Sequence, residues 1–519
     1  MRAAVLGIDL GTSQLKAMVR GADGRVLGRG RAGYPISVSS GASADPARSP
    51  AIGPAAEGYG GSSPRGTTAE TDPHQWWRAA REAVAEALAE ARLSGDGGIG
   101  EAEDAEDGDG IGAVGVTGQM HGVVLAAADG TPLRPATVWL DRRATAEADE
   151  YGQLPDRLTR PLGNAASPGM AGPILRWLVT HEPGAVGDAS WALQPKDWLR
   201  LWLTGQTATD PSDASGTLLF DQETGTWATD LVRELGIPGR LLPDIRDPAS
   251  VAPLLPAAAE DLGLRPGIPV AVGAADTAAS LYASRLPAGA ALLTLGTGGQ
   301  WIAPTQAIRP APNLNLFASA DGGHYHLAAA LNVGAALRWV TTVLGASYDE
   351  LYAAATRSWR SDTPVFLPYL IAEREDDTTR RGGTWAGLTF GHDRDDLLRA
   401  ALEGVSFTLR DRLDDLRAAG HDPDRVLVGG GGARDRGWRG MLADVFGLPL
   451  EFADGAEWLS ATGAAMLAEK GVGWGNGSTR SGEEGTETIR SRHPAAAGAN
   501  RERFSAHKSA MAGIGVLGS

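Results

Sequence analysis

Two short glycine-threonine segments carry groups suited to holding phosphate oxygens. Gly11-Thr12-Ser13 follows an apolar run that contains Asp9, and Gly296-Thr297-Gly298 follows a second apolar run that ends at Leu295. Glycine lets the backbone approach a phosphate, while hydroxyl and backbone N–H groups donate to its oxygens. A carboxylate at Asp9 can hold hydrated Mg²⁺ beside it. Each segment alone is more typical of an ordinary hairpin turn, but the Leu-Gly-Thr repeat favours the phosphate interpretation.

A carboxylate and a run of glycines add two further candidate features. Asp276 lies where a predicted strand meets a predicted helix, so it can cap that helix. In a kinase cleft it can instead orient an attacking hydroxyl and accept its proton. The segment Val428–Arg434 places four glycines between a strand and a helix, where bare backbone lets a flat ring approach. A tight loop has the same composition.

The segment Gly-Gln-Met-His-Gly at 118–122 stands between two predicted strands. Gln119 and His121 can bond hydroxyl groups, and Met120 can pack on carbon, which together suit a sugar pocket. A hairpin loop with a solvated histidine has the same pattern.

The composition limits the class of protein. The chain has 63 acidic and 47 basic residues, a net charge of −16, which disfavours nucleic acid and favours a small-molecule partner. It has no cysteine, so disulfides and thiolate nucleophiles are absent. The apolar run Ala3–Ile8 is too short for a signal peptide, and no stretch reaches the ~20 apolar residues of a membrane span. We expect a cytoplasmic protein without a membrane partner, and a homodimer stays open.

The elements that position these groups are expected in two lobes, because 519 residues exceed what one hydrophobic core supports. We expect an N-terminal, sugar-binding lobe over 1–266 and a C-terminal, nucleotide-binding lobe over 267–475. Glycine-rich, flexible insertions are expected at about 37–69 and 94–110. A low-complexity, partly disordered tail is expected over 476–519.

From about residue 3 to 470, ordered segments of the chain resemble the FGGY carbohydrate kinases. The matching segments include GIDLGTSQLK, ETDPHQWW, VTGQMHGVVL, DPSDASGTLLFD, LTLGTGG, LEGVSFTLRD and GGGGARDRGWRGMLADVFGLPL. GQMHG together with SDASGT is typical of members that act on D-xylulose, whereas the glycine motifs belong to the wider superfamily. The resemblance implies an α/β fold of two ribonuclease-H-like lobes, of the actin and hexokinase type, with an interdomain cleft.

The resemblance also implies ATP-dependent phosphorylation of D-xylulose to D-xylulose 5-phosphate, with Mg²⁺. Carried over by position, Asp276 is the expected proton acceptor and Asp9 assists Mg²⁺ through water. The ketopentose is expected to contact Gln119, Met120, His121 and Asp276. The expected nucleotide-binding residues are Gly11, Thr12, Ser13, Gly296, Thr297, Gly298, Gly431, Gly432 and Ala433.

The chain departs from the usual family motifs at four places. Thr277 and Leu140 each stand where asparagine is usual, and within Ile371–Asp376 the last five residues replace Gly-Glu-Arg-Thr-Pro. The segment Ser460–Ala465 replaces Pro-Ala-Leu-Gly-Ala-Ala. Two alternatives therefore stay open: a kinase of another ketose or pentitol, or a catalytically weak sugar- or nucleotide-binding regulator with the same fold. The presence of Asp276 favours an enzyme, because a binding module has no need of a proton acceptor.

Overall fold

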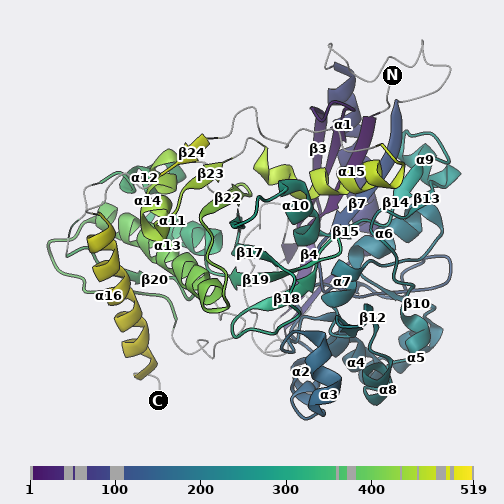
Figure 1. Ribbon diagram of the computed structural model, residues 1–519, viewed down its shortest axis with the longest axis horizontal. Coiled ribbons are helices and arrows are strands. Elements are labelled where there is room, and N and C mark those ends of the chain that lie inside the picture. The colour runs from purple at the N-terminus through teal and green to yellow at the C-terminus, as the bar shows by residue number, and fades with distance from the viewer. Residues whose placement is uncertain are drawn as a thin grey trace.

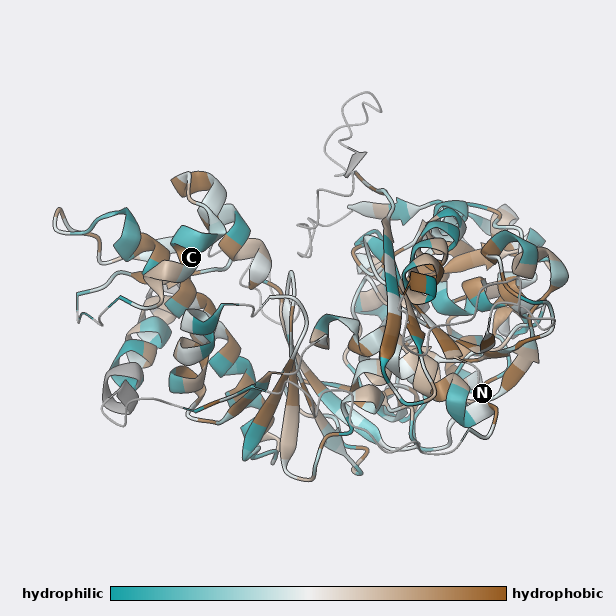
Figure 2. Ribbon diagram, turned by 90° about the horizontal axis from the view of Figure 1, so that it is seen from above, coloured by the Kyte–Doolittle hydropathy of each residue, from teal (hydrophilic) through white to brown (hydrophobic). Residues whose placement is uncertain are grey.

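Two sheets, each 7-stranded, organise the chain into two lobes in the computed structural model (Figure 1). Seen from above, the lobes lie side by side, with hydrophobic residues along the strands between them and in their interiors (Figure 2). The structure describes residues 4–39, 51–52, 67–93, 110–357, 360, 362–370, 382–432, 435–452, 455–474, 487–490 and 496–516.

The sheet of the N-terminal lobe starts as an antiparallel meander, β1-β2-β3, because short turns join its first three apolar strands. On its other side β1 pairs in parallel with β7, which also pairs in parallel with β14 and β15. The strand order is β13-β14-β7-β1-β2-β3. The strands are β1 (Ala4–Leu10), β2 (Gln14–Arg20), β3 (Val26–Gly33), β7 (Ile111–Gly118), β13 (Val251–Pro253), β14 (Pro269–Ala271) and β15 (Ala274–Ala275).

The sheet of the C-terminal lobe repeats this arrangement. Strand β16 pairs antiparallel with β17 and parallel with β22, which pairs in parallel with β23. Its full order is β18-β19-β17-β16-β22-β23-β24. The strands are β16 (Ala290–Leu295), β17 (Gly299–Thr305), β18 (Asn315–Ala318), β19 (His324–Ala330), β22 (Arg425–Gly429), β23 (Leu450–Phe452) and β24 (Glu487–Ile489).

The shared order, three antiparallel strands followed by two parallel ones, makes both lobes ribonuclease-H-like, as the sequence predicts. Smaller two- and four-stranded sheets lie outside these two. Their strands are β4 (Ile36–Ser39), β5 (Ala51–Ile52), β6 (Thr68–Thr71), β8 (Val124–Ala126), β9 (Ala136–Thr137), β10 (Trp191–Leu193), β11 (Phe220–Asp221), β12 (Thr226–Trp227), β20 (Val365–Leu367) and β21 (Thr384–Ala386).

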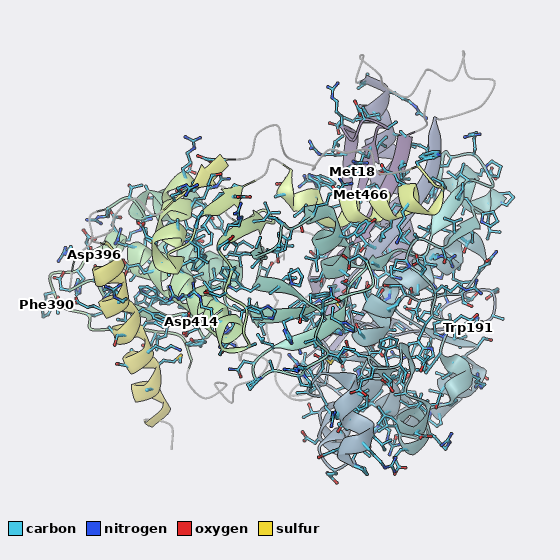
Figure 3. All side chains as sticks on the ribbon, viewed as in Figure 1. Met18, Trp191, Phe390, Asp396, Asp414 and Met466 are labelled. Carbon is cyan, nitrogen blue, oxygen red and sulfur yellow. The ribbon has the colours of Figure 1, made fainter. Side chains whose placement is uncertain are left out.

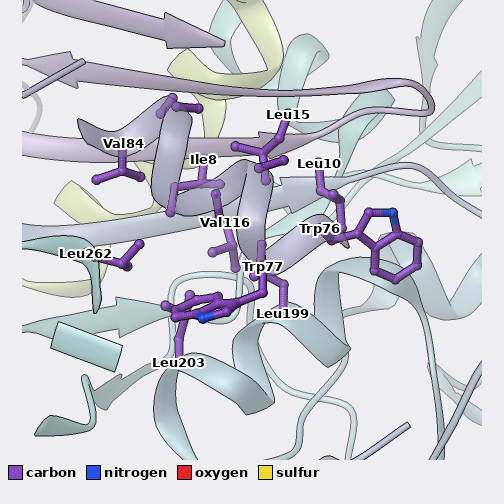
Figure 4. Packing of buried hydrophobic residues seen from close by; sticks show 14 of the residues in the cluster. Ile8, Leu10, Leu15, Trp76, Trp77, Val84, Val116, Leu199, Leu203 and Leu262 are labelled. Atoms are coloured by element: carbon purple, nitrogen blue, oxygen red, sulfur yellow. The ribbon is translucent and has the colours of Figure 1, made fainter. Parts of the chain in front are cut away.

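Helices cover the sheets and bury the apolar faces between them. In the N-terminal lobe the apolar stripe of α1 packs against the sheet and α6, with Trp76 fully buried (Figure 4). The helices are α1 (Pro73–Leu93), α2 (Thr145–Tyr151), α3 (Asp156–Thr159), α4 (Ala171–His181), α5 (Pro183–Asp188), α6 (Pro195–Thr204), α7 (Pro211–Ser215), α8 (Thr229–Glu234), α9 (Pro256–Leu262), α10 (Asp276–Ser284), α11 (Gly334–Leu344), α12 (Tyr348–Ala354), α13 (Arg394–Ala418), α14 (Arg436–Phe446), α15 (Leu459–Gly471) and α16 (Ala496–Val516). Among the described helices none is long and apolar enough to cross a lipid bilayer.

Helix α15 comes late in the chain but packs on the N-terminal sheet and on α10 (Figure 1). Backbone meets backbone there: a Cβ atom added to Gly115 would collide with Ala464 O, and one added to Gly463 with Ala279 O. The Met18 and Met466 labels in Figure 3 mark the same region, where Met18 is fully buried. The chain therefore returns to its first lobe after completing most of its second.

The lobe boundary differs from the expected position of 266/267. Strands β14 and β15 pair with β7, so residues 269–275 complete the N-terminal sheet. The second sheet starts at β16, at Ala290. An apolar strand has the same sequence pattern in either sheet, because the pattern does not identify the strand with which it pairs.

The two expected insertions lie mostly outside the described residues. At the ends of the first, β4 and β6 pair with each other, which extends ordered structure into both ends of the 37–69 segment. Residues 40–50, 53–66 and 94–109 are not among those described.

In the expected tail over 476–519 the structure has a strand and a helix, β24 and α16. The Arg503 guanidinium of α16 donates to the buried Glu403 carboxylate at 2.8 Å, and Phe504 packs against Phe407. Amino-acid composition does not predict these contacts, because it counts the glycine and serine of the segment and does not identify the few residues that pack.

Candidate active site

Both glycine-threonine segments form hairpin tips that line one cleft of about 720 Å³ between the lobes. Gly11-Thr12-Ser13 joins β1 to β2, and Gly296-Thr297-Gly298 joins β16 to β17. The first tip is closed by a hydrogen bond from Gly11 N to Gln14 O at 3.1 Å, and the Tyr34 hydroxyl donates to Gly11 O. The second is closed by Gly296 N donating to Gly298 O at 2.9 Å. The cleft thus has a phosphate-type tip from each lobe.

Asp9 and Asp276 meet at one edge of the N-terminal sheet. Asp9 lies near the end of β1, and Asp276 begins α10 directly after β15. Because β1, β7 and β15 are parallel neighbours, their carboxyl ends lie together, and both carboxylates line the cleft. Asp276 is the first residue of α10 rather than its cap, a position that Ala275 takes.

The Asp276 carboxyl group has a strongly perturbed acidity. Burial, reinforced by the negative charge of Asp9, raises its pKa to about 7. Two hydrogen bonds lower the pKa of Asp276 in part: Thr277 N donates to Asp276 Oδ1 at 2.6 Å, and Thr277 Oγ1 donates to the same oxygen at 3.2 Å. The positive charge of Lys16 also lowers this pKa. A carboxyl group with such a pKa changes charge near neutral pH, which suits a group that accepts a proton.

Asp9 is only 5% exposed, and burial raises its pKa despite the opposing charge of Lys16. Lys16 Nζ lies 3.9 Å from Asp9 Oδ2 and donates to Glu457 O of the C-terminal part at 2.9 Å. Asp9 Oδ1 has no hydrogen-bond partner among the described residues. A buried, unpartnered carboxylate oxygen suits a hydrated divalent cation.

The Gln119-Met120-His121 segment follows β7 and lies on the same side of the cleft as Asp276. His121 Nδ1 lies 2.7 Å from Gly216 O, so Nδ1 carries a proton, because a carbonyl oxygen only accepts. The His121 ring packs 5.9 Å from that of Phe317 in β18, which brings an apolar wall from the second lobe. Gln119 Nε2 donates to Gly11 O at 3.4 Å and ties this segment to the first tip.

The glycine-rich turn after β22 forms the far wall of the cleft with three aromatic residues. Gly432 N donates to Leu295 O at 2.8 Å, so this turn rests on the strand that leads to the second tip. Tyr352 stacks on Trp438 with ring centroids 5.9 Å apart and donates through its hydroxyl to Gly432 O at 3.4 Å. Tyr348 lies one helical turn before it, with ring centroids 6.0 Å apart.

All the described residues proposed from the sequence line this cleft. They are Asp9, Gly11, Thr12, Ser13, Gln119, Met120, His121, Asp276, Gly296, Thr297, Gly298, Gly431 and Gly432. Ala433 and Ile371–Asp376 lie outside the described residues. Of the two departures at asparagine positions, Thr277 lines the cleft, whereas Leu140 is buried in the core of the N-terminal lobe.

Sequence reasoning missed several lining residues. They are the cations Lys16, Arg31 and Arg338, and the aromatic side chains Trp139, Phe317, Tyr348, Tyr352 and Trp438. Hairpin register could have found Lys16, because the turn places it directly opposite Asp9. The tyrosine pair had a weaker signal, two aromatic residues four apart on a short helix. Trp139, whose Nε1 donates to Thr12 Oγ1 at 2.9 Å, directly precedes Leu140, and the family motif at that position was its signal.

Two ribonuclease-H-like lobes that bring two glycine-threonine tips and a carboxylate of raised pKa to one cleft are the arrangement expected of a two-lobed, ATP-dependent sugar kinase. The N-terminal domain of the FGGY family of carbohydrate kinases matches residues 50–283, and the C-terminal domain of that family matches residues 291–471. The chain belongs to the FGGY family of carbohydrate kinases.

Relatives and solved structures of similar length agree with this assignment. The chain is 32% identical over 472 residues to the xylulose kinase of Escherichia coli (strain K12), with 89% of each chain covered. It is 32% identical over 477 residues to the xylulose kinase of Klebsiella pneumoniae, with 90% of each covered. The crystal structure of xylulose kinase from Rhodospirillum rubrum superposes with a TM-score of 0.80 at 28% identity, with 99% of each chain covered.

Proposed function

We propose that this protein transfers the γ-phosphoryl group of ATP to D-xylulose and forms D-xylulose 5-phosphate and ADP. The observation that carries the proposal is the position of Asp276, which shares one cleft with the Gln119-Met120-His121 segment and both tips. The similar xylulose kinases of Escherichia coli and Klebsiella pneumoniae suggest the sugar. The net charge of −16 disfavours nucleic acid and agrees with a small-molecule substrate.

The proposed reaction is a displacement at phosphorus. The terminal hydroxyl oxygen of the sugar forms a bond to the γ-phosphorus, and the bond from that phosphorus to the bridging oxygen of ADP breaks, with its electron pair leaving on ADP. The proton of the hydroxyl goes to Asp276, which has to be ionised beforehand. His121 and Gln119 hold other hydroxyl groups, so that the reacting oxygen faces the phosphorus.

The two tips and the far wall would hold the nucleotide. Backbone N–H groups and hydroxyls at Thr12 and Thr297 suit the phosphate oxygens, while Lys16 and Arg338 bring positive charge to the cleft. Adenine fits between the Gly431 backbone and the aromatic face of Tyr352, because a bare backbone and a flat ring both accept a planar base. Bound Mg²⁺ would neutralise phosphate charge, and Asp9 suits a contact to it through water.

A kinase of another sugar is the competing function, and Thr277 is the observation that favours it. The Thr277 hydroxyl is turned onto Asp276 Oδ1, so it does not offer both a donor and an acceptor to a sugar, as an asparagine amide does. A ketose or pentitol with a different hydroxyl pattern would then fit better.

Coupled measurement of ADP release with a panel of D-xylulose, other ketoses, pentitols and glycerol tests both functions. We expect the highest kcat/KM with D-xylulose, and phosphorus NMR of the product should show a phosphate ester at its terminal carbon. Preference for another sugar would replace D-xylulose and keep the mechanism. ATP hydrolysis that ignores every sugar, or sugar binding by calorimetry without turnover, would refute the sugar-kinase function. The variant Asp276→Asn controls for contaminating kinases.

A further inference from the structure

The short helix α7 lies behind the cleft and carries Ser212–Ser215 of the SDASG segment, to which the proposed reaction assigns no role. Its residues Ser212–Ser215 are buried, and none of them lines the cleft. The helix contacts β15, which precedes Asp276, and β18 of the other lobe. A buried helix between these two strands is well placed to fix them.

Ser212 connects α7 to the backbone just before Asp276. Ser212 Oγ accepts a hydrogen bond from Ala275 N at 2.9 Å and donates to Asp210 Oδ2 at 2.5 Å. Asp210 Oδ2 also accepts from Ser212 N at 2.8 Å. The hydroxyl therefore has a donor and an acceptor partner, and its orientation is determined in a fully buried position.

A buried cation holds this chain of contacts in place. Lys196 Nζ lies 3.3 Å from both Asp210 Oδ1 and Asp213 Oδ2 and 2.5 Å from Asp197 Oδ1. It also donates to Val272 O, three residues before Ala275, at 3.3 Å. The ion cluster thus contacts the 272–275 segment directly and, through Ser212, a second time. Two attachments fix the direction in which α10 starts, and with it the Asp276 side chain.

The far end of α7 contacts the proposed sugar pocket. Gly216 follows the helix, and its carbonyl oxygen accepts from His121 Nδ1 at 2.7 Å. A Cβ atom at Gly216 would lie 2.8 Å from Met120 Cε and 3.2 Å from His121 Nδ1, so the backbone after α7 packs closely on this segment. Ser215 Oγ accepts from Ala318 N of β18 at 3.0 Å. One rigid segment therefore contacts the surroundings of the acceptor and of the sugar.

We propose that Ser212 is a positioning residue for Asp276: through its hydrogen bond to Ala275 N it holds the proton acceptor at the angle that phosphoryl transfer needs. This inference rests on the proposed function, because it assigns Asp276 the same role. Ser212 contacts neither the cleft nor a substrate and acts only through the start of α10.

A double-mutant cycle with Ser212→Ala and Asp276→Asn tests the inference. Ser212→Ala is expected to lower kcat on the order of 10-fold to 10²-fold and to leave the KM of the sugar within about threefold, because displacing a reacting group by about 1 Å has such an effect. In the Asp276→Asn background the same change should lower kcat less than about threefold, because the group it positions is gone. Ser284→Ala is the matched control at the other end of α10, where a buried hydroxyl donates to Leu281 O.

Hydrogen exchange, measured by mass spectrometry on the full chain, tests the hydrogen bond between Ala275 N and Ser212 Oγ independently of activity. Peptides that cover Ala275 should exchange at least about tenfold faster in Ser212→Ala than in Ser284→Ala, because the Ala275 amide loses its hydrogen bond to the Ser212 hydroxyl. Unchanged exchange, wild-type kcat, or equal losses in both backgrounds of the cycle would each overturn the inference. If the wild-type chain phosphorylates no sugar but the exchange difference is present, the proposed function fails while the positioning contact stands.

Discussion

We expect kcat/KM for sugar phosphorylation to fall on the acid side of neutral pH, because Asp276 becomes protonated there. The Asp276 pKa of about 7 results first from burial and second from the charge of Asp9. Because protonation removes the acceptor, kcat/KM for the sugar should fall as the pH drops through 7. An aspartate at its ordinary pKa of 3.8 would give no such change above pH 5.

The size of the effect follows from the fraction of Asp276 that is ionised. At pH 6, one unit below the pKa, about a tenth of the carboxyl groups carry charge, so kcat/KM should be about tenfold below its plateau. Asp276→Asn should lower kcat by on the order of 10² or more at pH 8. Asp9→Asn should move the remaining limb to lower pH, because it removes the negative charge that raises the pKa of Asp276.

The assay is initial-rate ADP release from about pH 5.5 to 8.5 at saturating MgATP, with constant ionic strength. ATP phosphates titrate in part of this range, so the pH profile of Asp276→Asn, which lacks the acceptor, measures their contribution and is divided out. A corrected profile that stays flat from pH 5.5 to 8.5 would refute the argument that burial and Asp9 raise the pKa of Asp276 to about 7. An Asp276→Asn variant with the wild-type rate would refute the assignment of the acceptor.

Two further substitutions distinguish the sugar and nucleotide parts of the site, and a third tests the packing of α15. His121→Ala should raise the KM of the sugar about tenfold with little change in the KM of ATP, because it removes a hydrogen bond; an effect on ATP alone would contradict its placement. Tyr352→Ala should raise the KM of ATP about tenfold and spare the sugar, because base stacking is lost; steady-state kinetics with both substrates varied distinguishes the two. Gly463→Ala should lower the free energy of unfolding by about 1–3 kcal/mol, because its Cβ would collide with Ala279 O; an unchanged urea midpoint would show that the helices move apart freely.

The sequence predicts the repeated strand pattern of the two lobes because each hairpin is local. The turn residues between β1 and β2 and between β16 and β17 are a few positions apart, so their pairing follows from alternation and glycine. The position of α15 is different, because a helix with apolar residues on several sides packs equally well on either sheet. Close backbone approaches between residues far apart in the chain decide it: Gly115 of the sheet lies against Ala464 O, and Gly463 lies against Ala279 O.

The residues of the candidate site also fall into those that the sequence predicts and those that it does not. Residues at strand ends, such as Asp9 and Asp276, could be found because the carboxyl ends of parallel strands meet at one edge. Tyr352 could not, because it comes from a short helix whose direction depends on tertiary packing. Ser212 was part of a recognised motif, but its contact with Ala275 N spans 63 residues and has no local pattern.

The arrangement of the strands indicates which substrate moves when the lobes close. Ala275 of β15 pairs with Gly118 of β7, so Asp276 and Gln119 continue from directly neighbouring strands of one sheet. The acceptor and the sugar-binding segment therefore belong to a single rigid body, whereas Gly296 and Gly431 belong to the other sheet. Closure would change the distance from phosphorus to the sugar oxygen and leave the distance from that oxygen to Asp276 as it is. Closure would bring the tip with Thr297 towards the tip with Thr12 and the sugar, and it would exclude water from the phosphoryl group.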